Sequence, residues 1–408
     1  MRAVQFDPTV PRFLATRLFG AITPAAYLGP ASPLRYGNVT EPRLPGDEWV
    51  RVQVSLGGIC GSDLHLARLE TSPLTSAYAS FPFVPGHENV GTVVETGRAA
   101  GGVSVGQRVT VEPVLPCRAR GIDPPCANCA AGDYNLCLRT TDGHLSPGLM
   151  IGACRDTGGS WGERFVAHRS QVLPVPDGVT DDEALLAEPM ACAAHALLRH
   201  PPADGATVLV IGGGVIGQCV VAALRAIGTR ARIIVLAKHD FQCAMAGQMG
   251  ADEVVALGPD EAHVEAVAAL TGGTVRRTLF GRRVLIGGAD LTLECVGSSP
   301  SLNDALGLTR PGGRVVLLGL AATPRSVDWT PIWLKELQIS GSYVYAWEGT
   351  ATARAGRTME IILGWMSAGK IRLSGLVTHR FPLHSYRKAL AAAIGKARSG
   401  AFKVALQP

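Results

Sequence analysis

The chain has 408 residues, of which 47% are hydrophobic and 17% charged, a balance that is typical of a globular protein and excludes a mainly disordered one. Its formal net charge is +5 without a dense run of Lys or Arg, which argues against nucleic-acid binding. The length is enough for two domains with separate cores. Residues 1–10 do not resemble a signal peptide. The apolar segment 208–228 is rich in glycine, so we predict a strand–turn–helix unit there rather than a membrane span.

The first part of the chain is rich in Pro and Gly and carries short runs in which apolar and polar residues alternate. Such runs predict strands at Val50–Val54, Asn89–Glu95 and Arg108–Val111. We therefore expect a β-rich domain of bent strands and loops.

Three short segments in and just after this region carry side chains that bind metals. Cys60 lies in Gly58–His65, His87 follows Pro85-Gly86, and Glu188 precedes Pro189. Each of these residues alone is more simply a buried structural residue. A thiolate, an imidazole and a carboxylate together, with a fourth position left to water or substrate, describe a catalytic zinc site.

From residue 207 onward the pattern changes to strands that alternate with helices. The helices are expected over residues 215–227 and 241–249. The strands are expected at Thr207–Ile211, Arg232–Leu236, Glu253–Val255, Asp290–Val296 and Arg314–Gly319. This alternation predicts an α/β fold with a doubly wound parallel sheet. Beyond it we expect a last strand at 339–343, a helix over 354–367 and a strand at 376–381.

A glycine motif follows the first of these strands and opens a helix. It reads Gly212-x-Gly214, then Val215-Ile216-Gly217. Glycines at this spacing allow a tight turn, close approach of a pyrophosphate and close packing of helix on strand. A metal site and a nicotinamide site on one chain indicate hydride transfer between an alcohol and a carbonyl compound.

Taken together, these features resemble the zinc-dependent medium-chain dehydrogenase/reductase family of the alcohol dehydrogenase superfamily over nearly the whole chain. The segments that carry the resemblance are Gly58–Gly97, Cys126–Cys137, Gly158–Glu163, Glu188-Pro189 and Lys403–Leu406. The resemblance implies a GroES-like catalytic domain at 1–187, a Rossmann dinucleotide-binding domain at 188–342 and a return to the catalytic domain at 343–408. Because Glu188 stands where the liver alcohol dehydrogenase type has cysteine, the chain is more similar to the polyol, threonine and glucose dehydrogenases.

The resemblance also implies roles around the catalytic zinc. Cys60, His87 and Glu188 would hold the metal, and Glu88 would lie just behind it and replace water or Glu188 in some states. Asp63 is expected to accept a hydrogen bond from the His87 ring, which fixes the tautomer of the imidazole.

Two residues near Cys60 resemble the proton relay of the family. Ser62 would take the proton of the substrate, and His65 would pass it toward solvent. The simpler alternatives are a turn residue for Ser62 and a surface side chain for His65. Leu64 and Trp161 are expected by family position to line the cleft.

A second, structural zinc is implied in a lobe at residues 117–137. Cys126, Cys129 and Cys137 match three of the four family ligands. Asp123 stands near the place of the fourth, but thiolates outrank carboxylates in a closed zinc site, so we predict Cys117 as that ligand. Asp123 is the alternative ligand, and a lobe without metal is the alternative reading.

The residues at the end of the second strand of the α/β region indicate which nicotinamide cofactor is preferred. Ala237 stands where an acidic residue would bind the ribose 2′-hydroxyl, and Lys238 and His239 follow it. This favours NADP(H), whereas nearby Asp240 keeps NAD(H) as an alternative. By resemblance, the nicotinamide is held by Val296, Gly297, Leu318 and Gly319.

The leading hypothesis is therefore a zinc-dependent oxidoreductase that acts on a secondary alcohol, polyol, sugar or cyclitol, or on the corresponding ketone. The alternatives are a zinc-free enone or quinone reductase of the same superfamily and a non-catalytic cofactor-binding sensor. We expect a homodimer or homotetramer without nucleic-acid or membrane partners. The cysteines outside the two sites stand singly, which favours packing roles and the reducing cytoplasm.

Two stretches are longer than is usual in the family. Residues 11–42 are expected to form an insertion or a remodelled surface hairpin, and residues 272–288 a basic loop insertion. Neither stretch has an assigned role.

Overall fold

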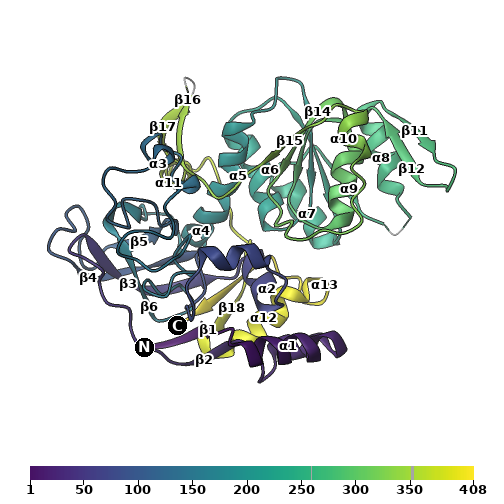
Figure 1. Cartoon of the computed structure of the whole chain (residues 1–408). Helices are drawn as coiled ribbons and strands as arrows, with labels where there is room; N and C mark the ends of the chain where they lie inside the picture. Colours follow the sequence, from purple (N-terminus) through teal and green to yellow (C-terminus); the bar gives the residue numbers. More distant parts are fainter. Residues whose placement is uncertain (259, 351–352) are drawn as a thin grey trace. The chain divides into compact units, whose positions relative to one another are not determined.

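The structure, a computed structural model, describes residues 1–258, 260–350 and 353–408 and divides into two compact units (Figure 1). Unit 1 comprises Met1–Glu188, Ala346–Ser367 and Leu373–Pro408, and unit 2 comprises Pro189–Tyr345 and Ala368–Arg372. Among the described residues, no helix is both long and apolar enough to cross a membrane.

Unit 1 is built on a seven-stranded, mainly antiparallel sheet, which confirms the predicted β-rich domain. The strand order is β18-β19-β3-β4-β5-β7, and β6 pairs with β3. Alternate residues of β3 are buried, because one face of the strand covers a core around Trp49 and Phe165. The strands are β3 (Trp49–Gly58), β4 (Asn89–Thr96), β5 (Arg108–Val111), β6 (Arg164–His168), β7 (Val172–Pro174), β18 (Val377–Pro382) and β19 (Lys403–Gln407).

Short helices and two hairpin-like pairs surround this sheet. The paired strands are β1 (Arg2–Phe6) with β2 (Leu34–Asn38) and β16 (Trp347–Thr350) with β17 (Ala353–Arg357). The α-helices are α1 (Val10–Ile22), α2 (Gly61–Ala67), α3 (Ala127–Ala130), α4 (Asp181–Leu185), α11 (Thr358–Ser367), α12 (Tyr386–Ile394) and α13 (Lys396–Ser399). The 3-10 helices are η1 (Pro24–Leu28), η2 (Pro73–Tyr78), η3 (Tyr134–Leu136), η4 (Arg169–Gln171) and η5 (Leu383–Ser385).

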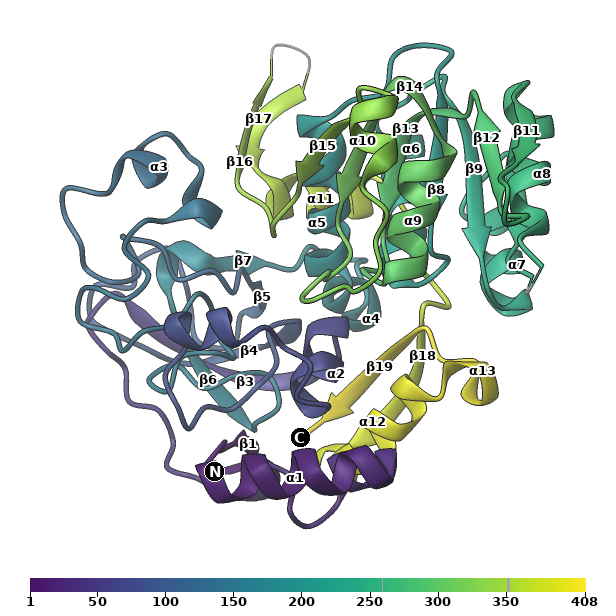
Figure 2. The ribbon, with the colours of Figure 1, turned by 45° about the vertical axis from the view of Figure 1, so that its right-hand side comes forward.

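Unit 2 contains a six-stranded parallel sheet in the order β10-β9-β8-β13-β14-β15 (Figure 2). Numbered along the chain, this is the order 3-2-1-4-5-6 of a doubly wound dinucleotide-binding sheet, and it confirms the predicted α/β fold. The strands are β8 (Thr207–Ile211), β9 (Arg232–Ala237), β10 (Glu253–Ala256), β13 (Ala289–Glu294), β14 (Thr309–Leu317) and β15 (Gln338–Gly341). The helices are α6 (Val215–Ala226), α7 (Asp240–Gln248), α8 (Ala262–Thr271), α9 (Ser299–Leu308) and α10 (Thr330–Leu334), and α5 (Ala187–Arg199) links the two units.

Both long stretches fold differently from the expectation. Most of 11–42 is helical, as α1 and η1, and only its end forms β2, because Pro11 at the start of the helix is preorganised for the first turn. Residues 272–288 form an antiparallel hairpin of β11 (Thr274–Arg277) and β12 (Arg283–Ile286) rather than an irregular loop. The expected helix over 354–367 begins at 358, because β17 occupies 353–357.

Candidate active site and metal centres

The predicted ligands Cys60 and His87 meet because their strands pair. Gly57, near the end of β3, lies opposite Asn89, the first residue of β4, so the segments beyond these ends lie together. The ligand atoms of Cys60, His87 and Glu88 all lie within 4.8 Å of one another. Cys60 also caps α2, with a backbone N–H that donates to Asp63 Oδ2 at 2.9 Å.

The charges around His87 favour a cation at this place. Burial alone would lower the pKa of His87, but the hydrogen bond with Cys60 and the negative charges of Cys60, Asp63 and Glu188 raise it well above its ordinary value. Burial raises the pKa of Asp63 in turn. A cysteine sulfur, an imidazole and the carboxylate of Glu88 within reach of one point, with Asp63 and Glu188 acting through their charges, form a donor set that fits a divalent zinc ion.

The other predicted residues of this site lie around the same cluster. Glu188 is buried at the start of α5 and acts electrostatically on His87 and Lys403. The carboxylate of Asp63 accepts its hydrogen bond from the backbone of Cys60, and it acts on the His87 ring through its charge. Asp63 thus orients the segment that presents the thiolate.

Glu88 is held by a partner that the sequence analysis missed. Lys403 Nζ donates to Glu88 Oε2 at 2.6 Å and to the carbonyl of Ile59 at 3.2 Å, and both charged side chains are buried. Gly58 makes room for the carboxylate, because a Cβ at this position would lie 1.9 Å from Glu88 Oε2. The backbone carbonyl of Glu88 accepts from Gly58 N at 3.0 Å and from Ser160 Oγ at 2.7 Å. Glu88 is therefore fixed beside the cluster by both its side chain and its backbone.

The two relay candidates lie on α2, directly after Cys60. Ser62 Oγ is buried and has no hydrogen-bond partner among the described residues, which is expected of a hydroxyl that serves a bound ligand. His65 Nδ1 lies 3.4 Å from Glu70 Oε2, although the two groups are too poorly aligned for a hydrogen bond. Trp161, expected to line the cleft, is instead fully buried, and its Nε1 donates to the carbonyl of Gly58.

Four thiols gather in the lobe at 117–137. The ligand atoms of Cys117, Cys126, Cys129 and Cys137 lie within 4.8 Å of one another. Backbone N–H groups point at the sulfurs, with Cys126 N donating to Cys117 Sγ at 3.3 Å. The hydrogen bond from Cys129 holds the pKa of Cys137 at about 5. Asp123, the alternative ligand, is exposed. Four thiols of this kind fit a closed tetrahedral zinc.

A buried arginine that the sequence analysis did not single out shapes this lobe. Arg120 is fully buried and donates only to backbone carbonyls, including those of Leu115 at 3.1 Å, Asp142 at 2.9 Å and Gly148 at 2.6 Å. These bonds satisfy carbonyl groups that a loop without regular structure would otherwise bury unpaired.

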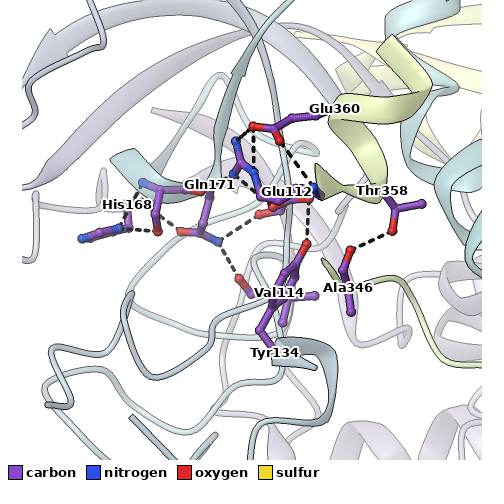
Figure 3. A network of polar contacts seen from close by, with 10 residues as sticks. Glu112, Val114, Tyr134, His168, Gln171, Ala346, Thr358 and Glu360 are labelled. Atoms are coloured by element: carbon purple, nitrogen blue, oxygen red, sulfur yellow. Dashed lines mark hydrogen bonds and ion pairs between the residues drawn. The ribbon is translucent and has the colours of Figure 1, made fainter. Parts of the chain in front are cut away.

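A polar network around Glu112 ties the lobe to the sheet (Figure 3). Tyr134 Oη donates to Glu112 Oε1 at 3.0 Å, and Arg357 Nη1 donates to Glu112 Oε2 at 3.2 Å. Gln171 Nε2 donates to the carbonyls of Glu112 and Val114 at 2.9 and 2.7 Å. Burial raises the pKa of Glu112 to about 7 in spite of Arg357 and Tyr134, which lower it. The network joins residues from β5, the lobe and β17.

In unit 2 the glycine motif has the geometry of a pyrophosphate site. Gly212 has a φ of +107°, which favours glycine, and a Cβ on Gly217 would lie 1.8 Å from the carbonyl oxygen of Gly212. A Cβ on Gly214, the residue that caps α6, would meet open space. The motif therefore lets a ligand approach the backbone at the start of α6, which Val215 and Ile216 open.

The loops after β13 and β14 are held by a buried acid that was also missed. Glu294 Oε1 accepts from the backbone N–H groups of Val296 and Gly297 at 2.9 Å each, and its backbone carbonyl accepts from Leu318 and Gly319. A side chain at Gly319 would collide with Gly297 N at 2.2 Å. Glu294 thus brings the four predicted nicotinamide residues together at the switch point between β8 and β13.

The residues predicted to select the adenosine ribose lie where β9 ends. Ala237 is the last residue of β9 and is buried, whereas Lys238 is exposed. His239 caps α7, and its ring stacks on Phe241 with a centroid distance of 5.5 Å. Asp240 is exposed in the first turn of α7.

Comparison with known proteins extends over both units. The zinc-binding dehydrogenase family matches residues 215–357, and the alcohol dehydrogenase GroES-like domain family matches residues 46–177. L-idonate 5-dehydrogenase of Vitis vinifera is 30% identical over 332 residues, which are 81% of this chain and 80% of that protein. Sorbitol dehydrogenase of Arabidopsis thaliana is 30% identical over 336 residues, 82% of each chain.

A solved structure shares the fold along nearly the whole chain. It is a zinc-binding dehydrogenase homologue from Sinorhizobium meliloti 1021, determined with NADP bound. It is 26% identical, has a TM-score of 0.69 and covers 92% of this chain and 95% of its own. These matches do not favour a zinc-free reductase or a non-catalytic sensor.

Replacing Lys403 with Met should lower the free energy of unfolding by about 3–5 kcal/mol, because it leaves a buried carboxylate without its partner. Chemical denaturation measures this change. The double variant Lys403→Met/Glu88→Gln should recover part of the loss. Lys370→Met, at an exposed lysine, should change the stability by less than about 0.5 kcal/mol. Equal losses in the single and double variants would contradict the pairing.

Replacing Cys117 with Ser should remove about one zinc per chain, because it opens the four-thiol cluster. Elemental analysis of the purified protein measures the zinc content. Asp123→Asn is the matched control and should keep the full content. If Asp123→Asn lost the metal and Cys117→Ser kept it, the carboxylate would be the fourth ligand.

Proposed function

The chain belongs to the zinc-dependent alcohol dehydrogenase family, whose members transfer a hydride between a nicotinamide cofactor and an alcohol or carbonyl compound, and from this premise we propose its substrate class, its ligands and its preferred cofactor. The substrate is a secondary alcohol, polyol, sugar or cyclitol. Two observations support this class: the buried carboxylate of Glu188 acts electrostatically on His87, as expected of a third ligand, and the relatives described above are named for idonate and sorbitol.

The observation that carries the proposal is the cluster of the half-buried Cys60 and His87 with the buried Glu88. Ser62, two residues after Cys60, has a buried hydroxyl without a hydrogen-bond partner among the described residues. Cys60, His87 and Glu188 would hold the catalytic zinc, with Glu88 behind it. Zinc supplies Lewis acidity, which lowers the pKa of an oxygen bound to it and polarises a carbonyl. The protein residues fix its position and exclude water from it.

A proton must leave the substrate when an alcohol is oxidised. In our proposal Ser62 Oγ accepts this proton, and His65 passes it to solvent, because an imidazole exchanges protons readily near neutral pH. The position of Ser62, two residues after a metal ligand and without a partner of its own, supports the relay.

The second zinc is proposed in the lobe, with Cys117, Cys126, Cys129 and Cys137 as its ligands. The gathering of four thiols supports this assignment, and the exposure of Asp123 argues against the carboxylate alternative. With all four positions taken by protein ligands, the metal would stabilise the lobe and take no part in the chemistry.

NADP(H) is the proposed preferred cofactor. Its pyrophosphate would bind at Gly212–Gly217 and its nicotinamide at Val296, Gly297, Leu318 and Gly319. Lys238 is exposed directly after β9, whose last residue is Ala237 rather than an acid, so its charge is able to pair with a 2′-phosphate, with His239 beside it. The NADP in the structure of the S. meliloti homologue supports the same preference.

We also propose that the protein forms a homodimer or homotetramer and lies in a reducing compartment. β15 is the last strand of the parallel sheet, and an edge strand is able to pair with the same strand of a second copy. The structure joins none of the described cysteines in a disulfide, which fits the proposed cytoplasmic location.

Replacing Cys60 with Ala tests the mechanism. We expect turnover of alcohols to fall by at least about a thousandfold, because the catalytic metal loses a ligand, and about one zinc per chain to be lost. Steady-state rates and elemental analysis measure both effects. Cys154→Ala, a buried cysteine outside both clusters, should keep the rate and the metal. Near-normal turnover by the Cys60 variant would refute the zinc mechanism.

Replacing Lys238 with Ala should raise the Michaelis constant for NADPH about tenfold more than that for NADH, because a charged hydrogen bond to the 2′-phosphate is lost. Initial rates with each cofactor measure the ratio. Asp240→Asn is the contrasting variant. If the ribose hydroxyl binds at Asp240, this change should raise the Michaelis constant for NADH more than that for NADPH. Equal effects of Lys238→Ala on both cofactors would contradict the NADP(H) preference.

A further inference from the structure

Helix α1 places its small residues against the protein and its large apolar residues in solvent. Thr16 and Gly20 are the buried residues of the helix. The large apolar side chains are exposed to between 40% and 78% and are Val10, Phe13, Leu14, Leu18, Phe19 and Ile22. This is the reverse of an ordinary surface helix, whose apolar stripe faces the core.

Contacts on the inner side of the helix fix it to the rest of unit 1. Its exposed side chains are therefore held in place before any partner binds. A Cβ at Gly20 would lie 2.4 Å from the ring of Tyr27, which shows how closely that ring covers the helix. Thr16 Oγ1 donates to the carbonyl of Ala31 at 2.9 Å. Figures 1 and 2 both show α1 as the outermost element on its side of unit 1.

Four of the exposed side chains form one ridge, and Phe13 and Phe19 lie on either side of it. Val10, Leu14, Leu18 and Ile22 follow one another at a spacing of four residues, which makes a ridge along the helix. The six side chains expose on the order of 600 Å² of apolar surface, at the upper end for a single patch on a monomer and near the 800 Å² or so that each partner gives to a standard interface. Two such faces would together bury on the order of 1,200 Å², which is the lower end of the range for a specific interface.

The cations of the helix are engaged within the chain. Arg12 Nη1 donates to Asp7 Oδ2 at 2.7 Å, and Arg17 Nη1 donates to the carbonyl of Leu69 at 3.1 Å. Helices that lie on an anionic membrane present free Lys and Arg to the lipid headgroups, which this patch does not do. An uncharged apolar ridge is instead complementary to a copy of itself.

We propose that α1 is an isologous interface at which two copies of this chain associate. A twofold axis over the middle of the helix sets the two ridges antiparallel, so that Leu14 packs against Leu18 of the second copy. This contact is separate from the pairing of β15 edges and does not depend on the proposed substrate or cofactor.

The test compares the molecular mass of the wild type with that of Leu14→Glu/Leu18→Glu, by sedimentation equilibrium over a range of protein concentrations. We expect the mass of the double variant to fall to half that of the wild type, while its circular dichroism and zinc content stay unchanged. The matched control is Leu279→Glu/Phe280→Glu, which changes two side chains that are almost fully exposed on the β11–β12 hairpin and should leave the mass as it is.

The antiparallel register has its own test. Leu14→Glu and Leu18→Lys should each give the lighter species alone, and their mixture should recover the heavier one, because the two charges face each other across the interface. A mixture that stays light would contradict this register.

Two further outcomes would overturn the proposal. One is a wild type that is monomeric, or that has the same mass as the double variant. The other is a wild type that binds phosphatidylglycerol vesicles in a flotation assay through Leu14 and Leu18, since the occupant of the face would then be lipid.

Discussion

The catalytic region depends on the buried ion pair between Glu88 and Lys403. The pair joins the segment that carries His87 to the start of β19, more than 300 residues later in the chain. Lys403 also donates to the carbonyl of Ile59, next to Cys60, so one ammonium group positions both ligand segments. A charge pair in such a place is costly to bury, and it is tolerated only because each partner is fully satisfied. Gly58 is required for the same reason, since any side chain there would displace the carboxylate.

In unit 2, the buried acid Glu294 has a role similar to that of Glu88 in unit 1. The loops that follow β13 and β14 must turn sharply and still present their backbone to a cofactor. The carboxylate and the carbonyl of Glu294 bind N–H groups from both loops, which fixes them without a bulky side chain at Gly297 or Gly319. In both units, therefore, a buried acid orders the backbone beside a proposed ligand site.

The cysteine lobe has almost no regular structure and lacks the core that would hold it. Arg120 of the lobe donates to backbone carbonyls of the segments beside it, such as those of Asp142 and Gly148, and the bond from Tyr134 to Glu112 ties the lobe to the sheet. A metal at the four thiols adds free energy to folding in such a segment. With the proposed metal bound, the lobe would combine a polar and a metallic anchor.

Local patterns in the sequence predicted β3, β4, β5 and β18 of unit 1, the six strands of the parallel sheet, the glycine motif, and the residue types of the two proposed metal sites. These depend on periodicity and on short spacings, which are properties of neighbouring residues. The resemblance to a family added the grouping of Cys117 with the other three cysteines.

Tertiary structure alone decided the features that join distant residues. The sequence does not show that Lys403 meets Glu88, that Trp161 is buried behind Gly58 rather than exposed to a cleft, or that 272–288 pairs as a hairpin. The four-residue spacing of Leu14, Leu18 and Ile22 is visible in the sequence and would ordinarily indicate a buried face. Whether an apolar ridge faces the core or the solvent depends on what the rest of the chain packs against it, and no local pattern contains that information.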